Sequence, residues 1–131
     1  MTNKETIFIY GTLKRECKNN NVMKEVEGKY ICEATTDICF PMYESSMGYP
    51  FLQKYTNGLG RKIKGEIWEV PLEKVERLNQ FEGVPYLYKP IYIDCYDENN
   101  GLWASIMTYM SSKPLNEEDL VDMTLLEEWK E

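Results

Sequence analysis

Short apolar runs recur along the chain with the length and the alternation expected of β-strands. Aliphatic and aromatic residues fill the first run almost without a break, whereas in the later runs they alternate with polar residues. A period of two places successive side chains on opposite faces of a strand. The runs predict strands at residues 6–10, 29–36, 61–70, 87–96 and 102–110.

Asparagine, glycine and proline mark the connections between these strands. Asn57-Gly58 and Asn100-Gly101 are pairs that favour tight hairpin turns. Residues 38–43 are apolar but contain Pro41, which cannot donate a backbone hydrogen bond. We therefore expect an edge strand or an extended segment there.

Two short helices are predicted within this framework. Asn21 is a residue type that caps helix N-termini, and Gly28 would end the helix that follows. Pro71 suits the first position of the second helix, and Gly83 is a favoured type just past a helix end. The apolar stripe of the second helix would consist of Leu72, Val75, Leu78 and Phe81.

The segment after Pro114 is acidic and carries apolar residues at helical spacing. We expect residues 114–131 to form an acidic C-terminal helix that lies on the body of the protein. Its apolar stripe would consist of Leu120, Met123, Leu126 and Trp129. The whole pattern predicts one α+β domain over residues 1–131, a small, mainly antiparallel β-barrel with two or three short α-helices.

Composition narrows the classes of function. The chain has 131 residues, 43% of them hydrophobic, which is a globular composition. Fifteen basic and 22 acidic residues give a formal charge of −7 without a basic cluster, so we expect no nucleic acid as a partner. Apolar runs are too short to span a membrane, and the N-terminal residues lack the apolar core of a signal peptide.

Cysteine and histidine usage limits the chemistry further. The cysteines are Cys17, Cys32, Cys39 and Cys95, which are widely spaced, and we expect reduced thiols in a cytoplasmic protein without a metal site. The chain contains no histidine, so Ser-His and Cys-His nucleophile pairs are excluded. Proton transfer would then depend on carboxylates, tyrosines, lysines or cysteines.

The first candidate site lies where the strand at residues 6–10 ends. Gly11 allows a ligand to approach the main chain, and the hydroxyl of Thr12 can bond to nearby backbone groups. A strand that runs into Gly-Thr-Leu can present backbone N–H groups to an anion. An ordinary turn at a strand end would have the same residue types.

The second candidate is Glu82, at the end of the predicted second helix. A negative charge there faces the negative end of the helix dipole, and apolar neighbours such as Phe81 and Val84 would desolvate the carboxylate. Both effects raise a carboxyl pKa, which suits a general base near neutral pH. The alternative is a glutamate at a helix end that points into water.

These residues also carry a family resemblance. The stretch Tyr10-Gly11-Thr12-Leu13-Lys14-Arg15 resembles the signature loop of the gamma-glutamylcyclotransferase-like superfamily. The motifs that follow in similar order are Tyr49-Pro50, Lys64-Gly65-Glu66-Ile67-Trp68, Phe81-Glu82, Leu87-Tyr88 and Tyr109. The most similar group is the gamma-glutamylamine cyclotransferases, in which Phe-Glu is also followed by Pro-x-Leu-Tyr. The resemblance covers residues 6–110 and not the tail.

The resemblance implies an enzyme without a metal or organic cofactor. Members release 5-oxoproline and a free amine from a small gamma-glutamyl substrate, whose own α-amine attacks its γ-carbonyl. By this resemblance Glu82 is the general acid and base. The backbone N–H groups of Gly11, Thr12 and Leu13 would hold the α-carboxylate or the developing oxyanion.

The resemblance also places three tyrosines at the pocket, namely Tyr10, Tyr88 and Tyr109, although core packing would explain Tyr109 equally well. Residues 16–21 and 44–60 would set the preference for the amine. Another class of function is a non-catalytic module that binds a gamma-glutamyl-like ligand or a protein partner. A thiol enzyme that uses Cys17 is a further alternative, but no activating base is evident beside Cys17.

Overall fold

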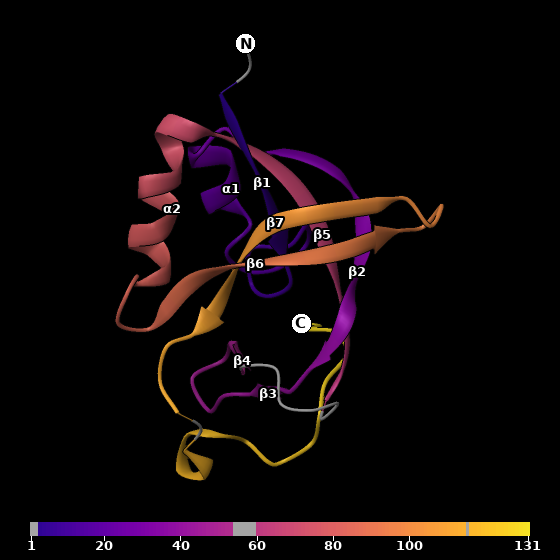
Figure 1. Cartoon of the computed structure of the whole chain (residues 1–131). Helices are drawn as coiled ribbons and strands as arrows, with labels where there is room; N and C mark the ends of the chain where they lie inside the picture. Colours follow the sequence, from indigo (N-terminus) through magenta and orange to yellow (C-terminus); the bar gives the residue numbers. More distant parts are fainter. Residues whose placement is uncertain (1–2, 54–59, 115) are drawn as a thin grey trace.

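The computed structural model describes residues 3–53, 60–114 and 116–131 (Figure 1). Its main feature is a closed barrel with the strand order β1-β5-β2-β6-β7. The neighbours pair antiparallel except β1 and β7, whose parallel pairing closes the barrel. The barrel strands are β1 (Lys4–Ile9), β2 (Lys29–Phe40), β5 (Arg61–Pro71), β6 (Tyr88–Asp97) and β7 (Leu102–Ser111).

Smaller elements surround the barrel. They are α1 (Asn21–Glu25), α2 (Val75–Glu82), the two-stranded sheet of β3 (Met42–Glu44) and β4 (Pro50–Leu52), and the 3-10 turns η1 (Leu72–Lys74) and η2 (Glu117–Asp119). Helix α2 lies outside the barrel, and the segment after β7 runs beside β3 and β4 (Figure 1). The predicted α+β barrel with short helices is thus confirmed.

Strand β1 is buried on both faces, which explains its unbroken apolar run. Ile7 and Ile9 pack in a core cluster with residues of α1 and α2, whereas Phe8 and Tyr10 pack in a second cluster with Ile67 of β5. Alternate side chains of one strand therefore enter different parts of the core. This position leaves the residues after Ile9 between the barrel and its covering helices.

Strand β5 needs a glycine where β1 crosses it closely. A Cβ atom added at Gly65 would lie 2.5 Å from the carbonyl oxygen of Ile9 and 2.6 Å from Cζ of Phe8. Real Cβ atoms do not approach other atoms this closely, so a side chain there would push β1 away. Gly65 thus helps to define the end of β1, from which the candidate loop begins.

Some local predictions are wrong in detail. Asn20, not Asn21, occupies the N-cap of α1, and its side chain makes no capping hydrogen bond. The first turn after Pro71 is the 3-10 turn η1, whose period of three changes the helical phase. Leu72 consequently lies 55% exposed instead of in the apolar stripe. Asn57-Gly58 lies outside the described residues.

The predicted tail helix is also wrong. Between Asn116 and Glu131 the only helical element is the 3-10 turn η2, and the rest is extended or irregular. Tail N–H groups bond to other strands instead: Val121 donates to the Glu44 carbonyl at 3.0 Å, and Leu126 donates to the Met42 carbonyl at 2.8 Å. Pairing with a strand edge thus replaces the hydrogen bonds of a helix.

Candidate active site

A cavity of about 280 Å³ opens beside the end of β1. The residues that line it come from β1 and the loop after it, from residues 47–50, from the end of α2, and from β6 and β7. All the site residues predicted from the sequence contribute to its wall, namely Tyr10, Gly11, Thr12, Leu13, Glu82, Tyr88 and Tyr109. The fold therefore brings together residues that lie up to 99 positions apart in the chain.

Gly11 is required by close packing and not by an unusual backbone angle. A Cβ atom at Gly11 would lie 3.1 Å from Cγ of Pro50, which is closer than most real contacts of this kind. Its φ is not among the positive values of the described chain. Pro50 also lines the cavity, and the expectation that Gly11 allows a ligand to approach the main chain stays a prediction.

Hydrogen bonds accepted by its own carbonyl groups hold the loop after β1 in its conformation. The backbone N–H of Lys14 donates to the Gly11 carbonyl at 3.1 Å, and that of Asn19 donates to the Thr12 carbonyl at 3.0 Å. The side-chain amide of Asn19 also donates to Oγ1 of Thr12 at 3.0 Å. Asn20 donates from Nδ2 to the carbonyl of Leu13 at 2.8 Å.

These bonds occupy the carbonyl groups of Gly11, Thr12 and Leu13 but not the N–H groups of the same three residues. Within the described part of the chain, the backbone N–H groups of Gly11, Thr12 and Leu13 have no protein acceptor. Adjacent free N–H groups on a cavity wall form a concave site suited to a carboxylate or an oxyanion. That these N–H groups bind an anion stays a prediction.

Glu82 is the last residue of α2 and contributes its side chain to the same cavity. Gly83 follows in the left-handed conformation with φ of 69°, which ends the helix as predicted. Burial raises the pKa of the Glu82 carboxyl from 4.5 to about 7. Such a carboxyl can accept and return a proton near neutral pH.

The three predicted tyrosines are buried and hydrogen-bonded. The hydroxyl of Tyr10 donates to the backbone carbonyl of Tyr109, and that of Tyr88 donates to the Pro50 carbonyl at 2.7 Å. The hydroxyl of Tyr109 donates to Oδ1 of Asn79 at 2.6 Å. Burial raises the pKa of each of these hydroxyls, with the Glu82 carboxylate as a further cause, so they remain neutral. Tyr109 therefore combines a structural bond with a place on the cavity wall.

The predicted specificity segments reach the cavity as well. Lys18 and Asn19 contribute from residues 16–21, and Met47, Tyr49 and Pro50 contribute from residues 44–60. Nζ of Lys18 donates to the Gly48 carbonyl at 2.5 Å, which links the two segments across the mouth of the cavity. Tyr49-Pro50 had been noted only as a motif of the resemblance, and Lys18, Asn19 and Met47 were not singled out because their residue types are common at exposed turns.

Glu66 supports the loop from β5 and was not predicted as a functional residue. Glu66 is only 6% exposed, and its side chain accepts hydrogen bonds from the backbone N–H of Arg15 at 3.0 Å, Nε of Arg15 at 3.2 Å and Nε1 of Trp68 at 3.1 Å. The Arg15 guanidinium also lies 3.7 Å from the ring centre of Tyr30. The sequence signal that could have identified this support is a glutamate within a predicted strand, because glutamate is seldom buried unless it is paired.

The structure disfavours the thiol alternative. Burial raises the pKa of the Cys17 thiol, which opposes formation of the reactive thiolate. Cys17 does not contribute to the wall of the cavity. Among the described residues, the cysteines are free thiols, and only Cys95 is fully buried. No cluster of three metal-ligating side chains occurs in this part of the chain.

Solved structures share this fold. The crystal structure of an AIG2-like protein from Mus musculus superposes with a TM-score of 0.85 at 24% sequence identity, covering 98% of this chain and 89% of that protein. At this identity the likeness shows the fold alone. No helix in the described residues is long and apolar enough to cross a membrane.

Sequence comparisons identify the family. Gamma-glutamylaminecyclotransferase A of Danio rerio is 31% identical over 87 residues, and gamma-glutamylaminecyclotransferase of Rattus norvegicus is 33% identical over the same length. Each match covers 63% of this chain and somewhat more than half of the relative, 53% and 58% respectively. The family model for gamma-glutamyl cyclotransferase, AIG2-like, matches residues 7–131, which include the tail. The chain belongs to this family.

Proposed function

We propose that the protein is a gamma-glutamyl cyclotransferase that releases 5-oxoproline and a free amine from a small gamma-glutamylamine. The observation that carries the proposal is that one cavity contains both Glu82, with a carboxyl pKa of about 7, and the free N–H groups of the loop after β1. The names of the relatives from Danio rerio and Rattus norvegicus support the choice of substrate class.

The proposed reaction is an internal acyl transfer. The α-amine nitrogen of the substrate attacks its γ-carbonyl carbon, and Glu82 accepts the proton that this nitrogen loses. The bond between the γ-carbon and the amine then breaks, and Glu82 returns the proton to the leaving nitrogen. Atoms balance without water, because 5-oxoproline and the amine together contain every atom of the substrate.

The cavity would supply position and charge stabilisation. Within a cavity of about 280 Å³ the gamma-glutamyl chain would bind in a folded pose, which would bring nitrogen and carbonyl carbon together. The N–H groups of Gly11, Thr12 and Leu13 would bind the α-carboxylate or the oxyanion on the γ-carbonyl. The neutral hydroxyls of Tyr10 and Tyr88 would form the remaining polar wall.

The test is mass spectrometry for 5-oxoproline. The purified protein is incubated with a panel of gamma-glutamylamines and gamma-glutamyl amino acids, beside Glu82→Gln and the control Glu76→Gln. Glu76 is an exposed glutamate in the first turn of the same helix. We expect product from the parent and the control, and a loss of about 10²–10⁴ in rate for Glu82→Gln.

Two results would contradict the proposal in different ways. Equal rates for the parent and Glu82→Gln would show that Glu82 is not the base. No product from any substrate, together with ligand-induced thermal stabilisation that survives Glu82→Gln, would favour the non-catalytic binding module.

For an active parent, kcat/KM should rise as pH increases through about 7, since Glu82 must lose its proton before it acts as a base.

A further inference from the structure

The loop after β1 is anchored by residues far along the chain. Residues 126–131, here called the strap, run from β3 past β5 to the loop after β1. The backbone N–H of Leu126 donates to the Met42 carbonyl at 2.8 Å, and the Glu127 carbonyl accepts from the N–H of Lys64 at 2.7 Å. These bonds fix the start of the strap to β3 and β5.

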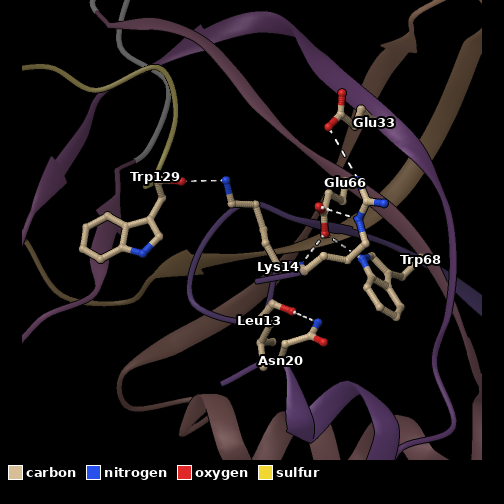
Figure 2. Close-up of polar contacts among 8 residues, drawn as sticks. Leu13, Lys14, Asn20, Glu33, Glu66, Trp68 and Trp129 are labelled. Atoms are coloured by element: carbon tan, nitrogen blue, oxygen red, sulfur yellow. Dashed lines mark hydrogen bonds and ion pairs between the residues drawn. The ribbon is translucent and has the colours of Figure 1, made fainter. Parts of the chain in front are cut away.

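The strap then reaches the loop at Lys14. Nζ of Lys14 donates to the Trp129 carbonyl at 2.6 Å, as Figure 2 shows. Lys14 directly follows Leu13, the last of the residues with free N–H groups on the cavity wall. The Trp129 carbonyl therefore holds the end of the donor segment from outside.

A second contact joins the strap to Lys18. Oε1 of Glu131 accepts from the backbone N–H of Lys18 at 2.8 Å, and Oε2 of Glu131 accepts from Nε1 of Trp129 at 3.0 Å. Trp129 is 6% exposed, so its ring is anchored in the protein and orients Glu131. Lys18 itself lines the cavity, so the strap contacts the loop on both sides of its turn.

The Lys14 contact is costly to break. Lys14 is 9% exposed, and its ammonium forms no ion pair with any carboxylate of the described chain. The Trp129 carbonyl thus provides solvation that water would otherwise supply. Separation of loop and strap would remove this carbonyl acceptor from the ammonium, so the contact favours their association.

We infer that Trp129 and Glu131 are positioning residues that hold the loop after β1 in the conformation that presents its free N–H groups to the cavity. The inference rests on the proposed function for the identity of the ligand that the loop binds, but not for the contacts that hold the loop. The strap touches no reacting atom and acts through Lys14 and Lys18. Its contribution is the alignment of donors before substrate arrives, which reduces the ordering cost of binding.

The test combines hydrogen exchange with kinetics. Amide exchange of residues 10–19 and kcat/KM for the active substrate are measured in the parent, Lys14→Met, Trp129→Ala and Glu131→Ala. Lys14→Met removes the ammonium but keeps an apolar side chain of similar length. Ile63→Val is the control, because Ile63 is fully buried inside the barrel and does not line the cavity.

We expect faster exchange confined to residues 10–19 and a loss of about tenfold or more in kcat/KM for Lys14→Met and Trp129→Ala. Glu131→Ala should also raise exchange in residues 10–19, and Glu131→Gln should restore only part of this loss, because its single amide oxygen can accept from the Lys18 N–H but not also from Nε1 of Trp129. Ile63→Val should change neither quantity when assayed well below its Tm.

The inference is overturned if Lys14→Met and Trp129→Ala leave exchange in residues 10–19 as in the parent. It is also overturned if exchange rises throughout the chain, since the strap would then support only global stability. Exchange is measured without substrate, so an inactive parent refutes the proposed function and leaves this test intact. Unchanged exchange with an active parent refutes the inference alone.

Discussion

The pKa of Glu82 has a consequence for stability that requires no substrate. The folded protein raises this pKa from 4.5 to about 7 because burial disfavours the charged carboxylate. In the unfolded chain the carboxyl ionises at its ordinary value. Replacement by glutamine removes the ionisation while it keeps nearly the same shape, so Glu82→Gln isolates the cost of the buried charge.

The sign and size follow from proton linkage. Between pH 4.5 and 7 the folded protein holds the Glu82 proton more tightly than the unfolded chain, so stability decreases as pH rises. One pKa unit corresponds to about 1.4 kcal/mol, and the displacement of Glu82 therefore corresponds to about 3 kcal/mol. As pH rises from 4.5 to well above 7, the unfolding free energy of Glu82→Gln should increase by this amount relative to that of the parent.

Urea unfolding at several pH values between 4.5 and 8 measures the effect. The chain has no histidine, the side chain that ordinarily titrates between pH 5.5 and 7. Glu82 is therefore expected to dominate the pH dependence of stability in this range. The quantity to plot is the difference in unfolding free energy between Glu82→Gln and the parent. A constant offset from packing cancels, and only the slope with pH reports the ionisation.

Glu76→Gln controls for the change in net charge. Glu76 is exposed on the same helix, so Glu76→Gln removes one charge at a site outside the cavity. The reasoning is refuted if Glu82→Gln and the parent give parallel stability curves over this range. Parallel curves would mean that the carboxylate is as well solvated in the folded protein as in the unfolded chain.

Three further substitutions test the packing and polar contacts around the site. Gly65→Ala should lower the urea midpoint, with a loss of about 1–3 kcal/mol, because its Cβ would meet the Ile9 carbonyl at 2.5 Å. Tyr88→Phe should lose about 1 kcal/mol or slightly more in thermal unfolding, since the buried Pro50 carbonyl loses its donor. Hydrogen bonds from the Trp103 ring and from backbone N–H groups lower the pKa of Asp97, so Asp97→Asn should be less stable than the parent at pH 7. The unfolding free energies of the parent and Asp97→Asn should converge as pH falls below 3.8.

Local signals were sufficient for the elements that carry the site. An unbroken apolar run before Gly11 predicted β1, and its burial on both faces explains why the run does not alternate. Proline and glycine at the two ends of the second helix placed Glu82 near its last residue. Apolar neighbours of Glu82 predicted the direction of its pKa. Each of these inferences depends on residues within a few positions of one another.

Predictions failed where distant parts of the chain compete for the same backbone groups. The tail has apolar residues at helical spacing, yet β3 accepts its N–H groups through the carbonyls of Met42 and Glu44. A short acidic helix gains little by itself, whereas bonds to strands add burial of residues such as Trp129. Periodicity within residues 114–131 contains no information about a strand edge 77 to 84 positions earlier.

The meeting of the base and the loop is likewise a product of distant contacts. The Tyr10 hydroxyl bonds to the carbonyl of Tyr109 on β7, and the Tyr109 hydroxyl bonds to the side chain of Asn79 on α2. The Asn79 carbonyl in turn accepts from the N–H of Val84, just past Glu82. Two tyrosines therefore connect the loop after β1 to the helix end through β7. Since β7 and β1 meet only in the closed barrel, the carboxyl and the free N–H groups face one cavity only after the barrel has closed.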